Sequence, residues 1–158
     1  KPAALFKNIA QPLITALSTS SSAATLPVSM DAAQNRFRIS SEVSSVVLPL
    51  GATVNMDGTA LFEGVAAVFL AQMFGIALDP ITITTIFLVA MMASIGAPGI
   101  PSGSMAGMQL VLLAVGIPLE AIALLLMIER PLDTFRTAVN VQGDLVGSLV
   151  VNKRVTFQ

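Results

Sequence analysis

The chain has 158 residues, of which 54% are hydrophobic and only 11% charged, and its formal net charge is -1. Soluble domains carry about 25% charged residues, so this composition is typical of a membrane protein and indicates no nucleic-acid partner. The sequence contains neither Cys nor His, which removes thiolate chemistry and the commonest general base and leaves carboxyl groups for any proton transfer.

The first elements predict a helical hairpin over residues 1–35. Residues 1–18 form a short apolar helix that contains Pro12 and is too short to cross a bilayer. A serine-rich stretch follows at residues 18–27, and residues 26–35 return as a second short helix. A flexible linker is the alternative interpretation of a serine run. The apolar surroundings favour a tight tip whose hydroxyl and N–H groups face a cavity.

A broken helix is predicted over residues 38–78, because Asn-Met-Asp-Gly-Thr at 55–59 interrupts a hydrophobic run. Asn and Asp compete for backbone hydrogen bonds, and Gly costs about 1 kcal/mol relative to Ala in a helix. Irregular backbone persists in a membrane only where it lines a cavity or is covered by protein. A β-turn with Asp57 as an ordinary turn residue is the alternative. Glu63 lies one turn after Thr59 on the same face, where a buried carboxyl group can carry a proton.

A second hairpin is predicted over residues 80–115, with apolar arms at 81–93 and 105–115. Its tip at 94–104 contains three glycines and two prolines, which cannot form a helix interior. A glycine-rich phosphate-binding nest is the alternative, but no Walker or dinucleotide pattern accompanies it. The glycines therefore favour a gate or lid that hinges at the tip.

The last predicted element is a long helix over residues 118–151 with one polar face. At about 100° per residue, six polar side chains fall within an arc of about 100°; they are Glu129, Asp133, Arg136, Thr137, Asn140 and Asp144. In a membrane helix such a face indicates a functional site, because lipid does not solvate charge. A soluble amphipathic helix, or a soluble enzyme with Glu129 and Asp133 as acid and base, is disfavoured by the composition.

The same order of elements occurs twice: short helix, polar tip, short helix, long helix. Paired short, interrupted hydrophobic segments in two halves indicate a secondary transporter with its site near the membrane midplane. The predicted fold class is thus an all-α membrane protein, with two re-entrant helical hairpins and two long helices, one of them broken, in an inverted repeat. A channel lined by the polar faces is the other hypothesis.

Four segments, residues 20–27, 51–61, 93–101 and 133–144, together resemble the C-terminal core of the glutamate transporter family, the dicarboxylate/amino acid:cation symporters. Asn-Met-Asp-Gly-Thr and Arg-Thr-x-x-Asn-Val-x-Gly-Asp are its most specific motifs. The resemblance implies a multi-pass cell-membrane protein in contact with lipid, a homotrimer, no enzymatic activity and no organic cofactor. It also implies that the core moves as an elevator against scaffold helices, which we expect upstream of Lys1.

The resemblance assigns substrate contacts by position. Arg136 pairs with the substrate side-chain carboxylate, Asp133 takes the amino group, and Asn140 and the first tip hold the main-chain carboxylate. The full implied set is Ser20, Ser21, Ser22, Thr59, Gly99, Ile100, Gly103, Asp133, Arg136, Thr137 and Asn140. Glu63 matches a position that is glutamate in proton-coupled members, which predicts proton coupling.

The resemblance also implies several Na⁺ ions, in keeping with oxygen ligands and the lack of His and Cys. The implied ligands are Gly51, Asn55, Asn140 and Asp144 for one ion, the carbonyls of Thr53, Ser94, Ile95 and Ala97 for a second, and Asp57 and Asn55 with upstream residues for a third.

The sequence departs from the family pattern at the positions of an extra arginine, which here are Ser20 and Thr134, and at Glu129, where the family has Asp. Arg130 is a candidate replacement for that arginine one turn earlier. The leading hypothesis is sodium-coupled uptake of aspartate or glutamate. A neutral amino acid symporter is disfavoured by Arg136, a C4-dicarboxylate symporter is disfavoured by the amino-binding carboxylate, and an anion-conducting channel stays as an alternative.

Overall fold

The computed structural model describes residues 2–155, and the side chains of residues 5–155. Lys1, the start of the predicted first hairpin, lies outside the described residues. All regular structure within 2–155 is helical, which confirms the all-α prediction. The elements are α1 Pro2–Thr19, α2 Ser22–Asp31, the π-helical turn η1 Ala32–Arg36, α3 Ser41–Val54, α4 Asp57–Met73, α5 Pro80–Ile95, α6 Ser104–Ala114, the 3-10 turn η2 Leu119–Ala121 and α7 Ile122–Val155.

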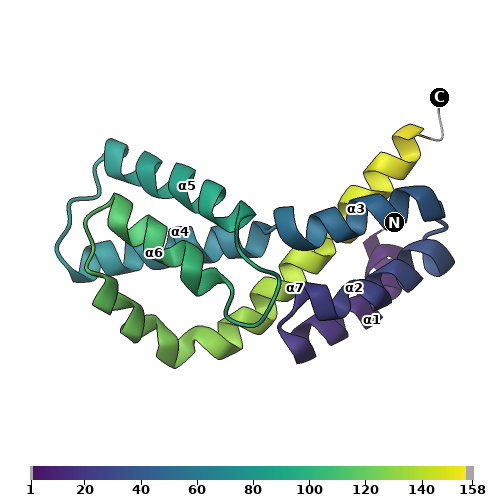
Figure 1. Ribbon diagram of the computed structural model, residues 1–158, viewed down its shortest axis with the longest axis horizontal. Helices are drawn as coiled ribbons and strands as arrows, with labels where there is room; N and C mark the ends of the chain where they lie inside the picture. The colour runs from purple at the N-terminus through teal and green to yellow at the C-terminus, as the bar shows by residue number, and fades with distance from the viewer. Residues whose placement is uncertain (1, 156–158) are drawn as a thin grey trace.

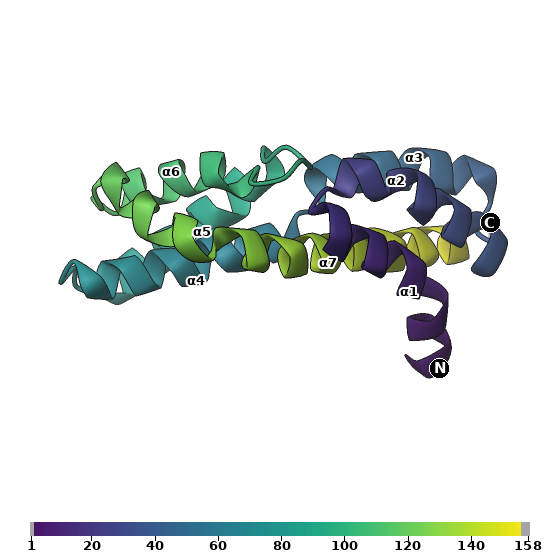
Figure 2. The same ribbon diagram turned by 90° about the horizontal axis from the view of Figure 1, so that it is seen from below.

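Two apolar clusters divide the molecule into halves that α7 connects (Figures 1 and 2). In one half α1, α2 and α3 pack against the C-terminal part of α7, where Val141 and Leu145 are buried. In the other half α4, α5 and α6 pack against its N-terminal part around Leu125. α7 is 34 residues long, about 50 Å, and therefore contributes to both clusters.

The polar segments meet in the waist between the two clusters. Ser21 Oγ of the first tip donates to the Gly99 carbonyl of the second tip at 2.7 Å, and Ala23 N–H donates to the same carbonyl at 3.1 Å. Gly58 N–H, just after the helix break, donates to Asn140 Oδ1 of α7 at 2.7 Å. The waist thus brings together both tips, the break and the polar face of α7.

The first tip is shorter than predicted. The expectation that the return helix starts at residue 26 is wrong, because α2 begins at Ser22. The Ser21 side chain accepts the N–H of Ala24 at 3.1 Å and caps the helix at this earlier point. Pro27 lies inside α2, so capping outweighs the hydrogen bond that this proline removes.

The helix break occurs where the sequence predicts it, at Asn55 and Met56 between α3 and α4. The segment from Ser41 to Met73 is long and apolar enough to cross a membrane, whereas α5 and α6 are shorter apolar helices. The predicted limits of 38–78 are too wide at the end of α4, because Gly75 adopts a φ of 68° that ends the helix.

The limits of the second tip and of the last helix also differ from the prediction. α5 extends to Ile95, which shortens the tip at its start. α7 begins at Ile122 and reaches Val155, beyond the predicted 118–151, and it continues through Pro131. Its ribbon changes direction in the N-terminal part (Figure 1), as expected where a proline lies inside a helix.

At Gly58 α4 lies close against the backbone of α7, which gives a first prediction. A Cβ at Gly58 would overlap the backbone carbonyl of Arg136, and backbone cannot move aside as a side chain can. We expect Gly58→Ala to destabilise the protein by about 1–3 kcal/mol, measured by thermal unfolding of the detergent-solubilised protein. Gly147→Ala on α7 is the control, since a Cβ there meets open space. Equal unfolding temperatures for both variants would contradict this close contact.

Candidate functional site

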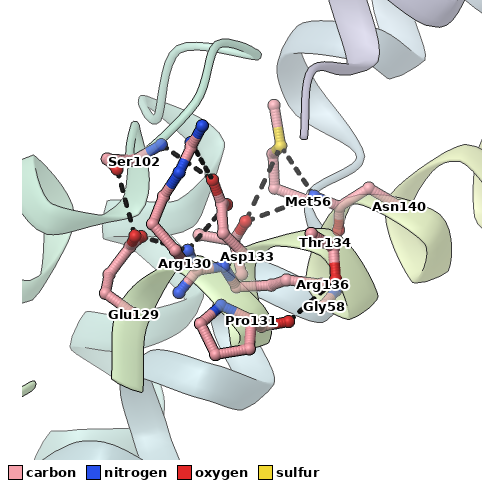
Figure 3. Close-up of polar contacts among 11 residues, drawn as sticks. Met56, Gly58, Ser102, Glu129, Arg130, Pro131, Asp133, Thr134, Arg136 and Asn140 are labelled. Carbon is pink, nitrogen blue, oxygen red and sulfur yellow. Dashed lines mark hydrogen bonds and ion pairs between the residues drawn. The ribbon is translucent and has the colours of Figure 1, made fainter. Parts of the chain in front are cut away.

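A buried arginine shared by two carboxylates lies on the polar face of α7 (Figure 3). Arg136 Nη2 donates to Glu129 Oε1 at 2.6 Å and to Asp133 Oδ1 at 2.7 Å. Spacings of seven and three residues place the three groups on one side of a helix. All three side chains are almost fully buried, so their charges depend on one another rather than on water.

The guanidinium of Arg136 is held on one side and free on the other. It lies over the ring of Phe62 from α4, 4.1 Å from the ring centroid, a cation–π arrangement. Nη1 is buried and has no hydrogen-bond partner among the described residues. Because buried donors are nearly always paired, this free nitrogen indicates a place for the oxygen of an anion.

Ser102 of the second tip closes the network, although the sequence did not single it out. Its N–H donates to Asp133 Oδ2 at 2.9 Å, and its hydroxyl donates to Glu129 Oε2 at 3.0 Å. The signal in the sequence is a hydroxyl within a glycine-rich loop opposite a carboxylate-bearing helix. That signal does not say which loop residue faces the helix.

A small polar cavity lies where the two tips, the break and α7 meet. It offers about 10 Å³ to the centre of a water molecule, room for about one water. Its walls are Ser20, Ser22, Met56, Thr59, Pro98, Gly99, Ile100, Gly103, Ser104, Asp133, Thr137 and Asn140. Nine of these were predicted substrate contacts; Met56, Pro98 and Ser104 were not. The other two predicted contacts are not among the walls of the cavity. Ser21 caps α2, and Arg136 bonds to Asp133, which is one of the walls.

Asn140 fastens the broken helix to α7. Its Oδ1 accepts the N–H of Gly58, while Nδ2 donates to Thr59 Oγ1 and to Met56 Sδ, both at 3.2 Å. The side chain thus uses its acceptor on the first turn of α4, and its donors on Met56 within the break and on Thr59 just after it. This arrangement aims Asn140 at the cavity rather than at Asp144, with which it was predicted to share an ion.

Glu63 is fully buried, and neither of its carboxyl oxygens has a hydrogen-bond partner among the described residues. It points from α4 toward α6, where a Cβ at Gly107 would overlap Oε1. The Ser104 hydroxyl, one turn before Gly107, is also buried without a partner. The absence of a side chain at Gly107 therefore makes room for this carboxyl group inside the second hairpin.

Most of the residues predicted for the first and third ions lie together on the α3 side of α7. Asn55 Nδ2 donates to Asp144 Oδ1 at 2.9 Å, and a Cβ at Gly51 would overlap that oxygen. A Cβ at Gly143 would lie 2.6 Å from Asn55 Nδ2 and 2.8 Å from Asp57 Oδ2. The carboxylate of Asp144 therefore lies against Gly51 and that of Asp57 against Gly143, with the Asn55 side-chain amide close to both Asp144 and Gly143.

The residues predicted for the second ion are placed differently. Thr53 is exposed and donates to the carbonyl of Leu50 at 3.0 Å. The Ser94 hydroxyl donates to the carbonyl of Met91 at 2.9 Å, and Ala97 N–H donates to the carbonyl of Ser94 at 3.1 Å. The hydroxyls of Thr53 and Ser94 thus bind carbonyls of their own helices, and the site that uses carbonyl ligands stays a prediction. Ile95 is half exposed at the end of α5.

Arg130, the proposed replacement for the missing arginine, reaches toward the same cluster from one turn earlier. Its Nη1 lies 3.9 Å from Asp133 Oδ2, and its side chain is 67% exposed. An exposed pair at this distance contributes little to stability. Thr134, at the family's arginine position, donates its hydroxyl to the Pro131 carbonyl at 2.8 Å.

Two loop tips meet at a buried cluster of charges in an apolar helical chain, an arrangement typical of a site inside a membrane protein. The chain matches the sodium:dicarboxylate symporter family over residues 1–154 and belongs to that family, whose members are transporters rather than enzymes. It is therefore part of a membrane protein.

Individual relatives are similar over nearly the whole chain. Excitatory amino acid transporter 2 of Mus musculus is 51% identical over 150 residues, which are 95% of this chain and 26% of that protein. Excitatory amino acid transporter 3 of the same species is 49% identical over 145 residues, 92% and 28% of the two chains. An excitatory amino acid transporter of Caenorhabditis elegans is 43% identical over 150 residues, 95% and 30%. The chain thus spans little more than a quarter of these relatives.

The Asn140 network gives a second prediction. Asn140→Ala leaves the buried N–H of Gly58 without an acceptor, which costs about 1–3 kcal/mol, and should lower the thermal unfolding temperature of the solubilised protein. Asn152→Ala near the end of the same helix is the control. Its side chain accepts the N–H of Ser40 in an exposed position, so removing it should lower the unfolding temperature less. A larger loss for Asn152→Ala would show that the break does not depend on Asn140.

Proposed function

We propose that this chain is the transport core of a sodium-coupled symporter for an acidic amino acid, aspartate or glutamate. The observation that carries the proposal is the free, buried Nη1 of Arg136 beside the Asp133 carboxylate. The names of the relatives support it, since they are called excitatory amino acid transporters.

The chemistry of the cluster favours an amino acid that carries an extra carboxylate. A guanidinium binds a planar carboxylate through two parallel hydrogen bonds, and Asp133 can accept from an ammonium group. Asn140 and the hydroxyls of Ser20 and Ser22 face the same cavity and suit the main-chain carboxylate. A neutral amino acid would offer no side-chain carboxylate to Arg136 Nη1, and a C4-dicarboxylate would offer no ammonium group to Asp133.

The charge of the waist favours binding together with cations. Five carboxyl groups, of Asp57, Glu63, Glu129, Asp133 and Asp144, accompany the buried guanidinium of Arg136 and the largely exposed one of Arg130, and an acidic substrate adds further negative charge. Hard oxygen ligands suit Na⁺, and the glycine-lined approach of Asn55, Asp57 and Asp144 fits such an ion. Bound Na⁺ would supply the positive charge that an anionic substrate lacks here.

We further propose that residues 1–35 and 80–115 are re-entrant hairpins, with α3 and α4 as the two parts of the broken membrane helix and α7 as the polar-faced helix. Basic residues gather near one end, where Ser40 N–H meets Asn152 on the C-terminal turns of α7. Four basic residues are close in sequence to Ser40 or Asn152, namely Arg36, Arg38, Lys153 and Arg154. Basic residues are enriched on the cytoplasmic side of membrane proteins. The first hairpin would thus enter from the cytoplasm and the second from outside.

The wider assembly is also part of the proposal. We propose a plasma or bacterial inner membrane location, a homotrimer, and scaffold helices from the same polypeptide against which this core moves. Contact between the two tips at Gly99 is compatible with a single central site that either tip can open.

Uptake of radiolabelled L-aspartate into liposomes tests the function, using the native polypeptide that contains this chain. We expect uptake that needs a Na⁺ gradient and that falls by about 30-fold or more with Arg136→Ala, since losing one partner of a buried charge pair costs about 2–5 kcal/mol. Arg130→Ala is the matched control, an exposed arginine of the same helix, and should retain uptake. Competition by succinate but not aspartate would refute the substrate, and a substrate-independent current insensitive to Arg136→Ala would favour a channel.

Glu63→Gln tests proton coupling. The amide has nearly the same shape but binds no proton, so we expect uptake that no longer responds to an inward proton gradient while still requiring Na⁺. Acidifying the outside should accelerate uptake by the unaltered protein, because an outside-facing carboxyl group loads a proton there. Glu42→Gln, an exposed position on α3, should keep the wild-type response. A Glu63→Gln protein with an unchanged pH response would assign Glu63 a structural role only.

A further inference from the structure

Four groups form a closed ring between α7 and the second tip (Figure 3). Arg136 Nη2 binds both Glu129 and Asp133. The other oxygen of each carboxylate accepts from Ser102, Glu129 from the hydroxyl and Asp133 from the N–H. One loop residue is thereby tied to the guanidinium through two separate carboxylates.

The ring occupies the groups that an acidic amino acid needs. Asp133 Oδ2, a candidate acceptor for the ammonium group, holds the Ser102 N–H, and Arg136 Nη2 is already bound to Glu129. The cavity beside the ring has room for about one water. An amino acid therefore cannot occupy this site until Ser102 leaves its position.

We propose that Glu129 and Ser102 form a latch in the substrate-free site and that they set substrate affinity, because the substrate has to displace them. The proposal rests on the proposed function. Glu129 carries the same functional group as the side chain of the substrate and competes with it for the same arginine. Displacement of Glu129 breaks its bond to Ser102 and frees the second tip.

The geometry shows why substrate can win this competition. Both carboxylates use Nη2 alone, and Nη1 has no partner among the described residues. A substrate carboxylate that binds both nitrogens replaces a single bond by the stronger two-bond arrangement. Ser102 itself has a φ of 59°, which is unfavourable for a residue with a side chain, so the tip leaves this conformation readily once its bonds are lost.

Ser102→Ala is the sharpest test, because it removes the hydroxyl bond to Glu129 and leaves the N–H bond to Asp133. We expect its dissociation constant for L-aspartate in Na⁺ to fall about three- to tenfold relative to wild type, the scale of one typical intramolecular hydrogen bond. Glu129→Gln should act in the same direction. The double variant should gain less than the sum of the two effects, since both remove one shared contact.

Rates distinguish a latch from a structural contact. The latch exists only in the empty site, so both variants should raise the association rate constant and leave the dissociation rate constant nearly unchanged. Thr134→Ala is the control: this hydroxyl lies next to Asp133 and bonds only its own helix, so neither rate should change. Thermal unfolding of each variant verifies that it is folded.

The outcomes separate this proposal from the function on which it rests. Wild-type protein that shows no Na⁺-dependent binding of L-aspartate refutes the function itself. Wild-type protein that binds, together with a Ser102→Ala variant whose affinity is unchanged or weaker, overturns the latch and leaves the function standing. A gain in affinity that comes entirely from slower dissociation overturns it as well.

Discussion

The structure depends on one buried cation, the guanidinium of Arg136, which two carboxylates of its own helix and one aromatic ring hold in place. A buried charge is tolerated only when it is paired and hydrogen-bonded. Because both acidic partners lie on α7, the pairing survives any movement of the neighbouring loops. The loop that touches it, at Ser102, can therefore leave without exposing an unpaired charge.

The glycines of the waist explain how so many polar groups meet there. At Gly51, Gly58, Gly107 and Gly143 an added Cβ would overlap a carboxylate, an amide or a carbonyl from another element. Each glycine removes a side chain where polar groups of two helices must approach. The side chains of Arg136, Glu129 and Asp133 are almost fully buried, which strengthens the electrostatic interactions among them.

Periodicity and residue chemistry sufficed for the parts of the fold that local rules control. The six polar residues on the face of α7 are all buried, and Asn55 and Met56 interrupt the helix where their neighbours suggest. Local rules failed where two local preferences compete, as at α2, where the Ser21 cap outweighs Pro27. They also failed for Ser102, since the partner of a loop residue depends on how the loop folds back. Likewise, no pattern shows that Arg136 turns toward Glu129 and leaves one nitrogen free.

Most polar groups of the site find their partners inside the chain, whereas the apolar outer surface needs partners outside it. The described groups of the candidate site come from both tips, the break and α7, and they meet in the waist between the two apolar clusters. The outward faces of α4 and α5, in contrast, expose large apolar side chains such as Leu61, Ile81 and Met92, which need lipid or protein around them. Because the polar site is internal and the apolar faces are external, the movement of Ser102 that admits a substrate need not disturb the surface that α4 and α5 present to lipid or protein.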